Sequence, residues 1–209
     1  MEKRIEKISA ASLRPLKPVL VNWQELMDVD FWDDRNDAPW WYNERALLSL
    51  FAGAVWKCRR GWAFEEFTTD KWKTTKRGKR KKRKGRGDIL FGIGNRGFVA
   101  EAKQCWPILG NKNQGVTEMI TKTLRAACRD CASLPSEGYK RLGIVFAVPR
   151  IRMSKEKEKD TCEILDDFLS VISSFNTAAS VSIFPSEKRF LKGGDDYIYP
   201  GIVLLIKPL

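Results

Sequence analysis

The sequence predicts an α/β fold in which helices pack on one mixed β-sheet. Segments with an apolar stripe at helical spacing alternate with short apolar strands, and three of the strands follow one another without an intervening helix. The expected elements are, in order, a helix at 39–59, strands at 61–72, 88–93 and 98–103, a helix at 114–133, a strand at 142–148, a helix at 155–175, and strands at 180–184 and 199–206. We expect one domain over residues 37–209, preceded by an irregular N-terminal arm at 1–36.

Each expected helix carries one stripe of apolar residues. The stripes are Leu47, Leu48, Phe51 and Val55 in the first helix, Val116, Ile120, Leu124, Ala127 and Cys131 in the second, and Leu165, Phe168, Leu169 and Ile172 in the third. The first helix begins after Asp37, a capping residue, with Pro39 in its first turn. Glu44 lies on the stripe of that helix, so its carboxylate points toward the sheet or its edge. A carboxylate there needs a partner, which a metal ion, a lysine or an arginine can supply.

The pattern of residues 88–103, two strand-like runs separated by a glycine-rich turn, predicts a β-hairpin. If Asn95 and Arg96 are the turn residues, one face is apolar and consists of Ile89, Phe91, Ile93, Phe98, Ala100 and Ala102. The other face carries Asp88 opposite Lys103, with Glu101 beside them. Two carboxylates on adjacent strands can hold Mg²⁺ for phosphodiester hydrolysis, and a lysine can orient the attacking water. The alternative is an exposed hairpin end with an Asp–Lys cross-strand pair.

The positive charge of the chain is concentrated in one segment. Residues 71–86 hold eleven Lys or Arg and no Asp or Glu, in a chain whose net charge is +12. Because this segment joins two strands and can bury nothing, we expect a mobile cationic loop that binds the phosphates of a nucleic acid. Its candidate binding residues are Lys76, Arg77, Lys79, Arg80, Lys81, Lys82, Arg83, Lys84 and Arg86.

Composition excludes several classes of protein. The chain contains no histidine, so Ser-His-Asp, Cys-His and histidine general-base catalysis are excluded. Five cysteines without a framework spacing indicate reduced thiols and a cytoplasmic location. The longest aliphatic run, at 202–206, is far short of a membrane span, so we expect no membrane association.

The pattern of Asp88 followed by Glu101-Ala102-Lys103 resembles the motif of the PD-(D/E)XK nuclease superfamily, which has the restriction-endonuclease-like fold. In that motif an Asp begins one strand of a hairpin, and Glu or Asp, any residue and Lys lie on the next strand. The residue before the Asp is here Gly87 instead of Pro. The expected order of elements over residues 39–150 is also similar to the αβββαβ core of the family. A C-terminal αββ extension would enlarge the sheet.

The resemblance implies a set of site residues and a cofactor. Asp88, Glu101 and the backbone carbonyl of Ala102 would bind Mg²⁺, with Mn²⁺ able to substitute, and Lys103 would lie near the nucleophilic water. Glu44 would add a ligand, because many members carry a Glu on the helix before the hairpin. Gln104 would contact the substrate or support a ligand.

Two functions follow from these observations. The first is a Mg²⁺-dependent DNA endonuclease, with a homodimer or a larger complex as one way of cutting both strands. The second is a non-catalytic nucleic-acid-binding protein that uses residues 71–86. Residues 92–97 also match the G-x-G-x-x-G dinucleotide-binding pattern, but a strand follows them where that pattern requires a helix, so we reject it. The two remaining functions differ in whether they need a divalent metal.

Overall fold

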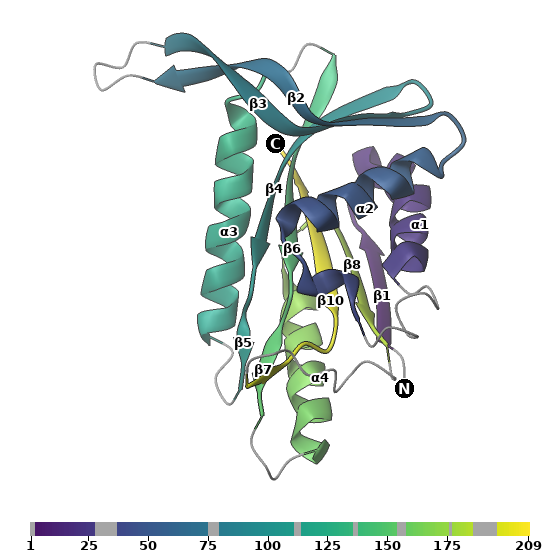
Figure 1. Ribbon diagram of the computed structural model, residues 1–209, viewed down its shortest axis with the longest axis vertical. Helices are drawn as coiled ribbons and strands as arrows, with labels where there is room; N and C mark the ends of the chain where they lie inside the picture. The colour runs from purple at the N-terminus through teal and green to yellow at the C-terminus, as the bar shows by residue number, and fades with distance from the viewer. Residues whose placement is uncertain are drawn as a thin grey trace.

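A seven-stranded mixed β-sheet forms the middle layer of the molecule (Figure 1). The structure, a computed structural model, describes residues 3–27, 37–74, 80–110, 114–135, 138–153, 158–175, 177–185 and 196–209. The strands are β1 (Lys3–Ile8), β2 (Gly61–Thr74), β3 (Arg80–Ile93), β4 (Arg96–Cys105), β6 (Tyr139–Ala147), β8 (Ala179–Phe184) and β10 (Ile202–Pro208). They lie in the order β1-β8-β10-β6-β4-β3-β2, in which β4 and β6 are parallel and the other neighbours antiparallel.

Helices cover both faces of this sheet. Among the described residues, α1 (Lys17–Met27) and α2 (Glu44–Trp56) pack on one face, and α3 (Gln114–Ala132) and α4 (Glu158–Ser174) pack on the other (Figure 1). The expected stripe of each long helix is buried, with Phe51, Ile120 and Phe168 fully so. These two apolar layers on one mixed sheet confirm the α/β class.

The remaining elements are short. They are the 3-10 helices η1 (Ala11–Leu16) and η3 (Pro39–Trp41) and a small sheet of β5 (Ile108–Leu109), β7 (Arg150–Arg152) and β9 (Tyr197–Ile198). None of the helices in the described ranges combines the length and apolar character needed to cross a membrane.

Residues 3–27 are not the irregular arm that we expected. β1 is an edge strand that pairs with β8, and α1 buries Trp23, whose ring stacks on Phe146 of β6 at a centroid distance of 6.4 Å. The expectation was wrong because the sequence of β1, Lys-Arg-Ile-Glu-Lys-Ile, is mostly charged and has no pattern typical of a buried strand. It forms a strand because it pairs with β8, which lies near the other end of the chain. The rest of the expected arm, residues 1–2 and 28–36, lies outside the described residues.

Helix α2 begins later than its sequence suggests. Asp37 accepts hydrogen bonds from the Ala38 N–H and, at 2.6 Å, from the Tyr42 hydroxyl, and the 3-10 turn η3 follows it. The capping residue of α2 is Asn43, whose side-chain oxygen accepts from the Ala46 N–H. The expected start at residue 39 was therefore wrong. This correction places Glu44 in the first turn of α2.

The β3–β4 hairpin turns at Gly94 and Asn95. Gly94 has a φ of +59°, a conformation that glycine adopts at little cost. Phe91 pairs with Phe98, so the expected register, with Ile93 opposite Phe98, was wrong by two residues. Because side chains alternate with a period of two, a shift of two leaves every residue on its expected face.

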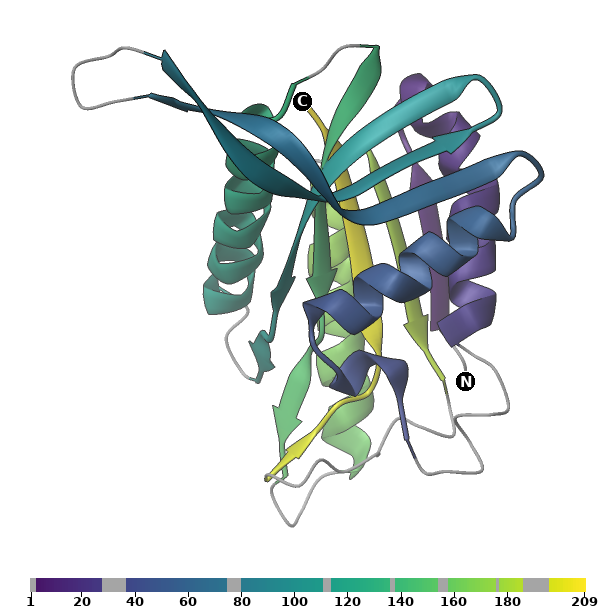
Figure 2. The same cartoon turned by 45° about the horizontal axis from the view of Figure 1, so that its top comes forward.

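β2 and β3 extend beyond the sheet as a two-stranded antiparallel ribbon (Figure 2). We define the ribbon as residues 67–74 and 80–87, which pair from Phe67–Gly87 to Thr74–Arg80. The expectation of a cationic loop was therefore wrong for residues 71–74 and 80–86, which are paired strands. Residues 75–79, which include Lys76, Arg77 and Lys79, lie outside the described residues. A strand needs a hydrogen-bonding partner for its backbone and does not need to be buried, so a run of charges can form one.

Candidate functional site

The departure of β3 from β4 at Asp88 creates the candidate site. β3 pairs with β4 only from Ile93 to Ile89, whereas β4 stays paired with β6 as far as Cys105. The edge of β4 beyond Glu101 therefore has no strand partner. Its backbone N–H groups need other acceptors.

Two carboxylates accept these N–H groups. The Ala102 N–H donates to Oδ2 of Asp88 at 2.8 Å, and the Gln104 N–H donates to Oε2 of Glu44, also at 2.8 Å. Ala102 and Gln104 are two residues apart, so both N–H groups point to the edge that β3 leaves. The side-chain amide of Gln104 donates to the Tyr42 carbonyl at 3.0 Å and so joins β4 to the turn before α2.

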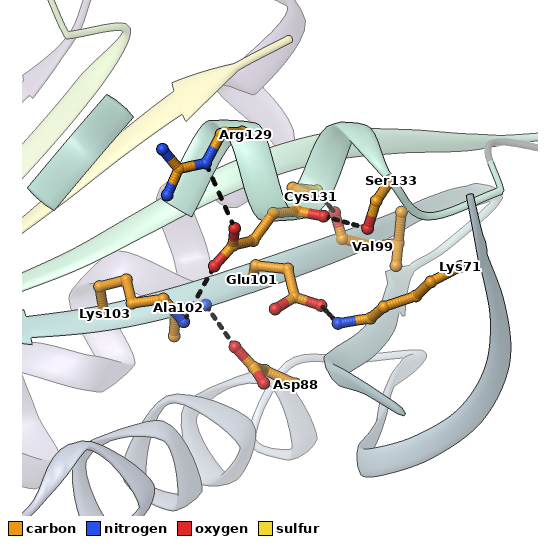
Figure 3. Close-up of polar contacts among 10 residues, drawn as sticks. Lys71, Asp88, Val99, Glu101, Ala102, Lys103, Arg129, Cys131 and Ser133 are labelled. Carbon is orange, nitrogen blue, oxygen red and sulfur yellow. Dashed lines mark hydrogen bonds and ion pairs between the residues drawn. The ribbon is translucent and has the colours of Figure 1, made fainter. Parts of the chain in front are cut away.

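Glu101 is a buried carboxylate on the α3 side of β4. It is 3% exposed, and its Oε1 accepts a hydrogen bond from the Lys71 ammonium at 2.7 Å (Figure 3). The pKa of Glu101 is raised to about 7, chiefly by burial and also by the neighbouring Asp88, while Lys71 and Lys103 act in the opposite direction. Asp88 and Glu101 are therefore close enough to repel each other.

Lys103 lies among the carboxylates of three elements. Its Nζ is 3.6 Å from Oδ2 of Asp130 on α3, and its charge also acts on Glu101 and on Glu44. Burial raises the pKa of Glu44, an effect that Lys103 and the Gln104 N–H partly offset. The structure thus brings together all four residues that the sequence selected, Asp88, Glu101, Lys103 and Glu44.

Lys71 and Asp130 belong to this cluster, and sequence reasoning missed both. Asp130 directly precedes Cys131, a residue of the apolar stripe of α3, so its place at the margin of that stripe was a usable signal. Lys71 lies far along β2 from the hairpin. Regular alternation along that strand does not predict its contact with Glu101.

A break in β2 at Glu66 explains how Lys71 reaches the site. Glu66 has a φ of +50°, and the pairing of β2 with β3 is interrupted there. Glu65 accepts a hydrogen bond from Ser49, and Glu66 pairs with Arg45, so two successive side chains point toward α2. Beyond this break the alternation is reversed, which turns the odd-numbered side chains of β2 toward α3.

Phe67 is the first side chain turned in this way. It packs against Val99, Cys131 and Leu134, and its ring lies directly on Gly87. A Cβ at Gly87 would lie 2.4 Å from the Phe67 ring, closer than real Cβ contacts allow. This contact explains why glycine, and not proline, precedes Asp88.

The residues present fit a Mg²⁺ ion in their chemistry. Mg²⁺ is commonly held by one or two carboxylates and keeps several waters, and the site offers the carboxylates of Asp88 and Glu101. The carbonyl of Ala102 points to the same edge of β4 as its N–H, toward Asp88. Within the described ranges, no group of three or more Asp, Glu or Cys side chains is arranged to hold a metal ion. Glu44 therefore does not form a three-carboxylate site with Asp88 and Glu101.

Glu44 should stabilise the fold through its contact with β4. Glu44→Ala removes the acceptor of the Gln104 N–H, and we expect a loss of about 1–2 kcal/mol in the free energy of unfolding. Glu44→Gln keeps an oxygen acceptor and should stay within about 0.5 kcal/mol of the parent. Urea unfolding in EDTA measures both variants. Equal stability of Glu44→Ala and the parent would contradict the capping role.

Glu101 should make stability depend on pH in the absence of metal. Its pKa is raised from 4.5 to about 7 in the folded protein, so folding favours the protonated form. Its stabilising contribution is complete below pH 4.5 and is lost as the pH rises through about 7. Glu101→Gln should therefore unfold roughly 2–6 °C above the parent at pH 8 and show little difference at pH 4.5. Thermal unfolding in EDTA at both pH values tests this, and an unchanged difference would contradict it.

No protein-family model, curated protein or solved structure matches this chain. A proposal for the function therefore rests on the residues around Glu101 and on their contacts.

Proposed function

We propose that the protein is a metal-dependent endonuclease that hydrolyses phosphodiester bonds of DNA. The observation that carries this proposal is the meeting of Asp88, Glu101 and Lys103 where β3 leaves β4, at the root of a cationic ribbon. A buried carboxylate with a raised pKa, beside a second carboxylate and a lysine, is typical of catalytic sites.

Each residue has a role that its position supports. Asp88, Glu101 and the Ala102 carbonyl would hold Mg²⁺ or Mn²⁺, and Glu44 would hold the backbone of β4 beside them through the Gln104 N–H. When bound, the ion would act as a Lewis acid, lowering the pKa of a coordinated water and offsetting negative charge on the phosphate. Lys103 orients the attacking water and stabilises negative charge on the phosphate oxygens. Gln104 supports Glu44 through its backbone N–H.

The ribbon supports duplex DNA as the substrate. Its eight residue pairs span about 25 Å, and the major groove of B-DNA, about 12 Å wide, admits a two-stranded ribbon. The major groove of duplex RNA is too narrow for side chains to enter. Exposed cations lie on both faces of the ribbon, Lys82 and Lys84 on one and Lys81 and Arg83 on the other. Either face can therefore contact phosphates.

The order of elements also supports the proposal. α2, β2, β3, β4, α3 and β6 follow the αβββαβ order of the restriction-endonuclease-like core, with α4, β8 and β10 as the extension. In this order the hairpin of Asp88 and Glu101 lies beside the parallel pair β4–β6, which holds β4 in place where β3 departs.

Incubation with nucleic acids tests the function. Plasmid, linear duplex and single-stranded DNA, and duplex RNA, are incubated with the protein in Mg²⁺, Mn²⁺ or EDTA. We expect cleavage of duplex DNA with either metal and none in EDTA, because the carboxylates alone supply no electrophile. Gel analysis of the products measures this. Cleavage that persists in EDTA would contradict the proposal.

A specific observation favours the second function, non-catalytic binding of nucleic acid. Asp88 and Glu44 already cap backbone N–H groups, and Glu101 already has Lys71 as partner, so each carboxylate has a structural role. The same experiment separates the two functions. Tight binding of duplex DNA in EDTA, without cleavage in any metal, is the result expected of a binding protein.

A further inference from the structure

Lys71 differs from the other cations of the ribbon. Its side chain is 28% exposed and its ammonium lies 2.7 Å from the buried carboxylate of Glu101. Lys81, Lys84 and Arg86 are exposed to solvent. One lysine of the candidate DNA-binding surface is thus directed into the candidate metal site.

The backbone around Lys71 holds it in this place. The break at Glu66 turns Lys71 toward α3, and the N–H of the next residue, Trp72, donates to the Ser133 carbonyl at the end of α3 at 2.8 Å. The stem of Lys71 crosses Gly85 on β3, where a Cβ would lie 3.1 Å from the Cγ and Cδ atoms of Lys71. The contact of Lys71 with Glu101 therefore depends on three features of the backbone: the break at Glu66, the hydrogen bond of the Trp72 N–H, and the absence of a side chain at Gly85.

The partners of Glu101 explain what Lys71 does there. A carboxylate that is 3% exposed requires a compensating positive charge, and Asp88 adds a second negative charge beside it. Lys71 supplies one charge through a single hydrogen bond at the end of a flexible stem. A divalent cation held by Asp88 and Glu101 would supply two charges and would replace the Lys71 ammonium as the partner of Glu101.

We propose that Lys71 is a positioning residue that exchanges partners, holding Glu101 in the metal-free protein and moving to a phosphate of the bound DNA when a divalent cation binds Glu101. This inference rests on the proposed function. It makes metal binding and DNA binding mutually favourable, because either event favours separation of the Lys71–Glu101 pair, which the other event also requires. It also gives a reason for the position of the ribbon, whose first pair, Phe67–Gly87, adjoins Asp88 of the candidate metal site.

Amine labelling tests the first half of the exchange without any cleavage. The protein is acylated with a lysine-reactive reagent at pH 8 in EDTA or in Mn²⁺, with no nucleic acid, and Lys71 and Lys84 are quantified by mass spectrometry. We expect Lys71 to react about fivefold faster in Mn²⁺ than in EDTA, and about fivefold faster in Glu101→Gln than in the parent in EDTA. Lys84, which is exposed, serves as the internal control and should not change.

DNA affinity tests the second half. Lys71→Gln and its matched control Lys84→Gln each remove one charge from the ribbon, and binding is measured on a phosphorothioate duplex that resists cleavage. In EDTA, Lys84→Gln should weaken binding and Lys71→Gln should not, because Lys71 is engaged with Glu101. In Mn²⁺, both variants should weaken binding by a similar factor of about 3–10.

Calorimetry with Mn²⁺ distinguishes failure of this inference from failure of the proposed function. If Mn²⁺ binds the parent and not Asp88→Asn, but the labelling of Lys71 is unchanged by Mn²⁺, the partner exchange is wrong and the metal site stands. Equal effects of Lys71→Gln in EDTA and in Mn²⁺ overturn the exchange in the same way. Absence of any Mn²⁺ binding overturns both proposals.

Discussion

Asp88→Asn and Glu101→Gln are each expected to lower the rate of DNA cleavage by about 10²–10³-fold or more while the fold remains intact. Both changes remove a negative charge and keep the shape of the side chain. Asparagine at position 88 still offers an oxygen to the Ala102 N–H, so it separates the capping contact from metal binding. Initial rates of cleavage at saturating Mg²⁺ measure the effect, and circular dichroism checks the fold.

Lys103→Met should cause a loss of similar size, because it removes the ammonium that faces Glu101 and Glu44. Glu65→Gln is the matched control, since Glu65 is an exposed carboxylate on β2 that is bonded to Ser49 and lies outside the cluster. Full activity of Asp88→Asn and Glu101→Gln would show that the carboxylates are structural and would favour the binding function.

Replacing Lys81, Lys82, Arg83 and Lys84 by glutamine is expected to weaken DNA binding and flatten its dependence on salt. If the parent neutralises about six to ten phosphates, its affinity should fall by roughly 10³–10⁵ between about 50 and 200 mM salt. Loss of four contacts should reduce the slope of log Kd against log salt by up to about 4. Cleavage at saturating DNA should largely survive, because these side chains lie along the ribbon, where Lys82 pairs with Asp70 and not with a carboxylate of the candidate site. Fluorescence anisotropy in EDTA measures the binding.

Glutamine is chosen for these substitutions because glycine or serine would also weaken the pairing of β2 with β3. A control variant replaces four exposed cations away from the ribbon, Arg14, Lys17, Lys57 and Arg59, by glutamine. It removes the same charge and should leave the salt slope close to that of the parent. If both variants lose affinity equally, the protein binds through its overall charge and the ribbon is not the docking surface.

Much of the fold could be predicted because it depends on local patterns. The apolar stripes of α3 and α4 and the apolar run of β6 appeared as expected, since a helix or central strand shows which face it buries by its spacing alone. The face shared by Asp88, Glu101 and Lys103 could also be predicted, because alternation along a strand does not depend on the exact register. These features required no knowledge of distant segments.

The sequence by itself determined the α/β class, the hairpin that carries Asp88 and Glu101, and the concentration of positive charge in residues 71–86. Only the tertiary structure decided that β1 joins the sheet, that the cationic segment is a paired ribbon, and that Lys71 and Asp130 reach the carboxylates. Each of these depends on a partner distant in sequence or on the positive φ of Glu66, which reverses the alternation of β2. Such contacts form only when the chain packs, so residue spacing does not specify which distant residue becomes the partner.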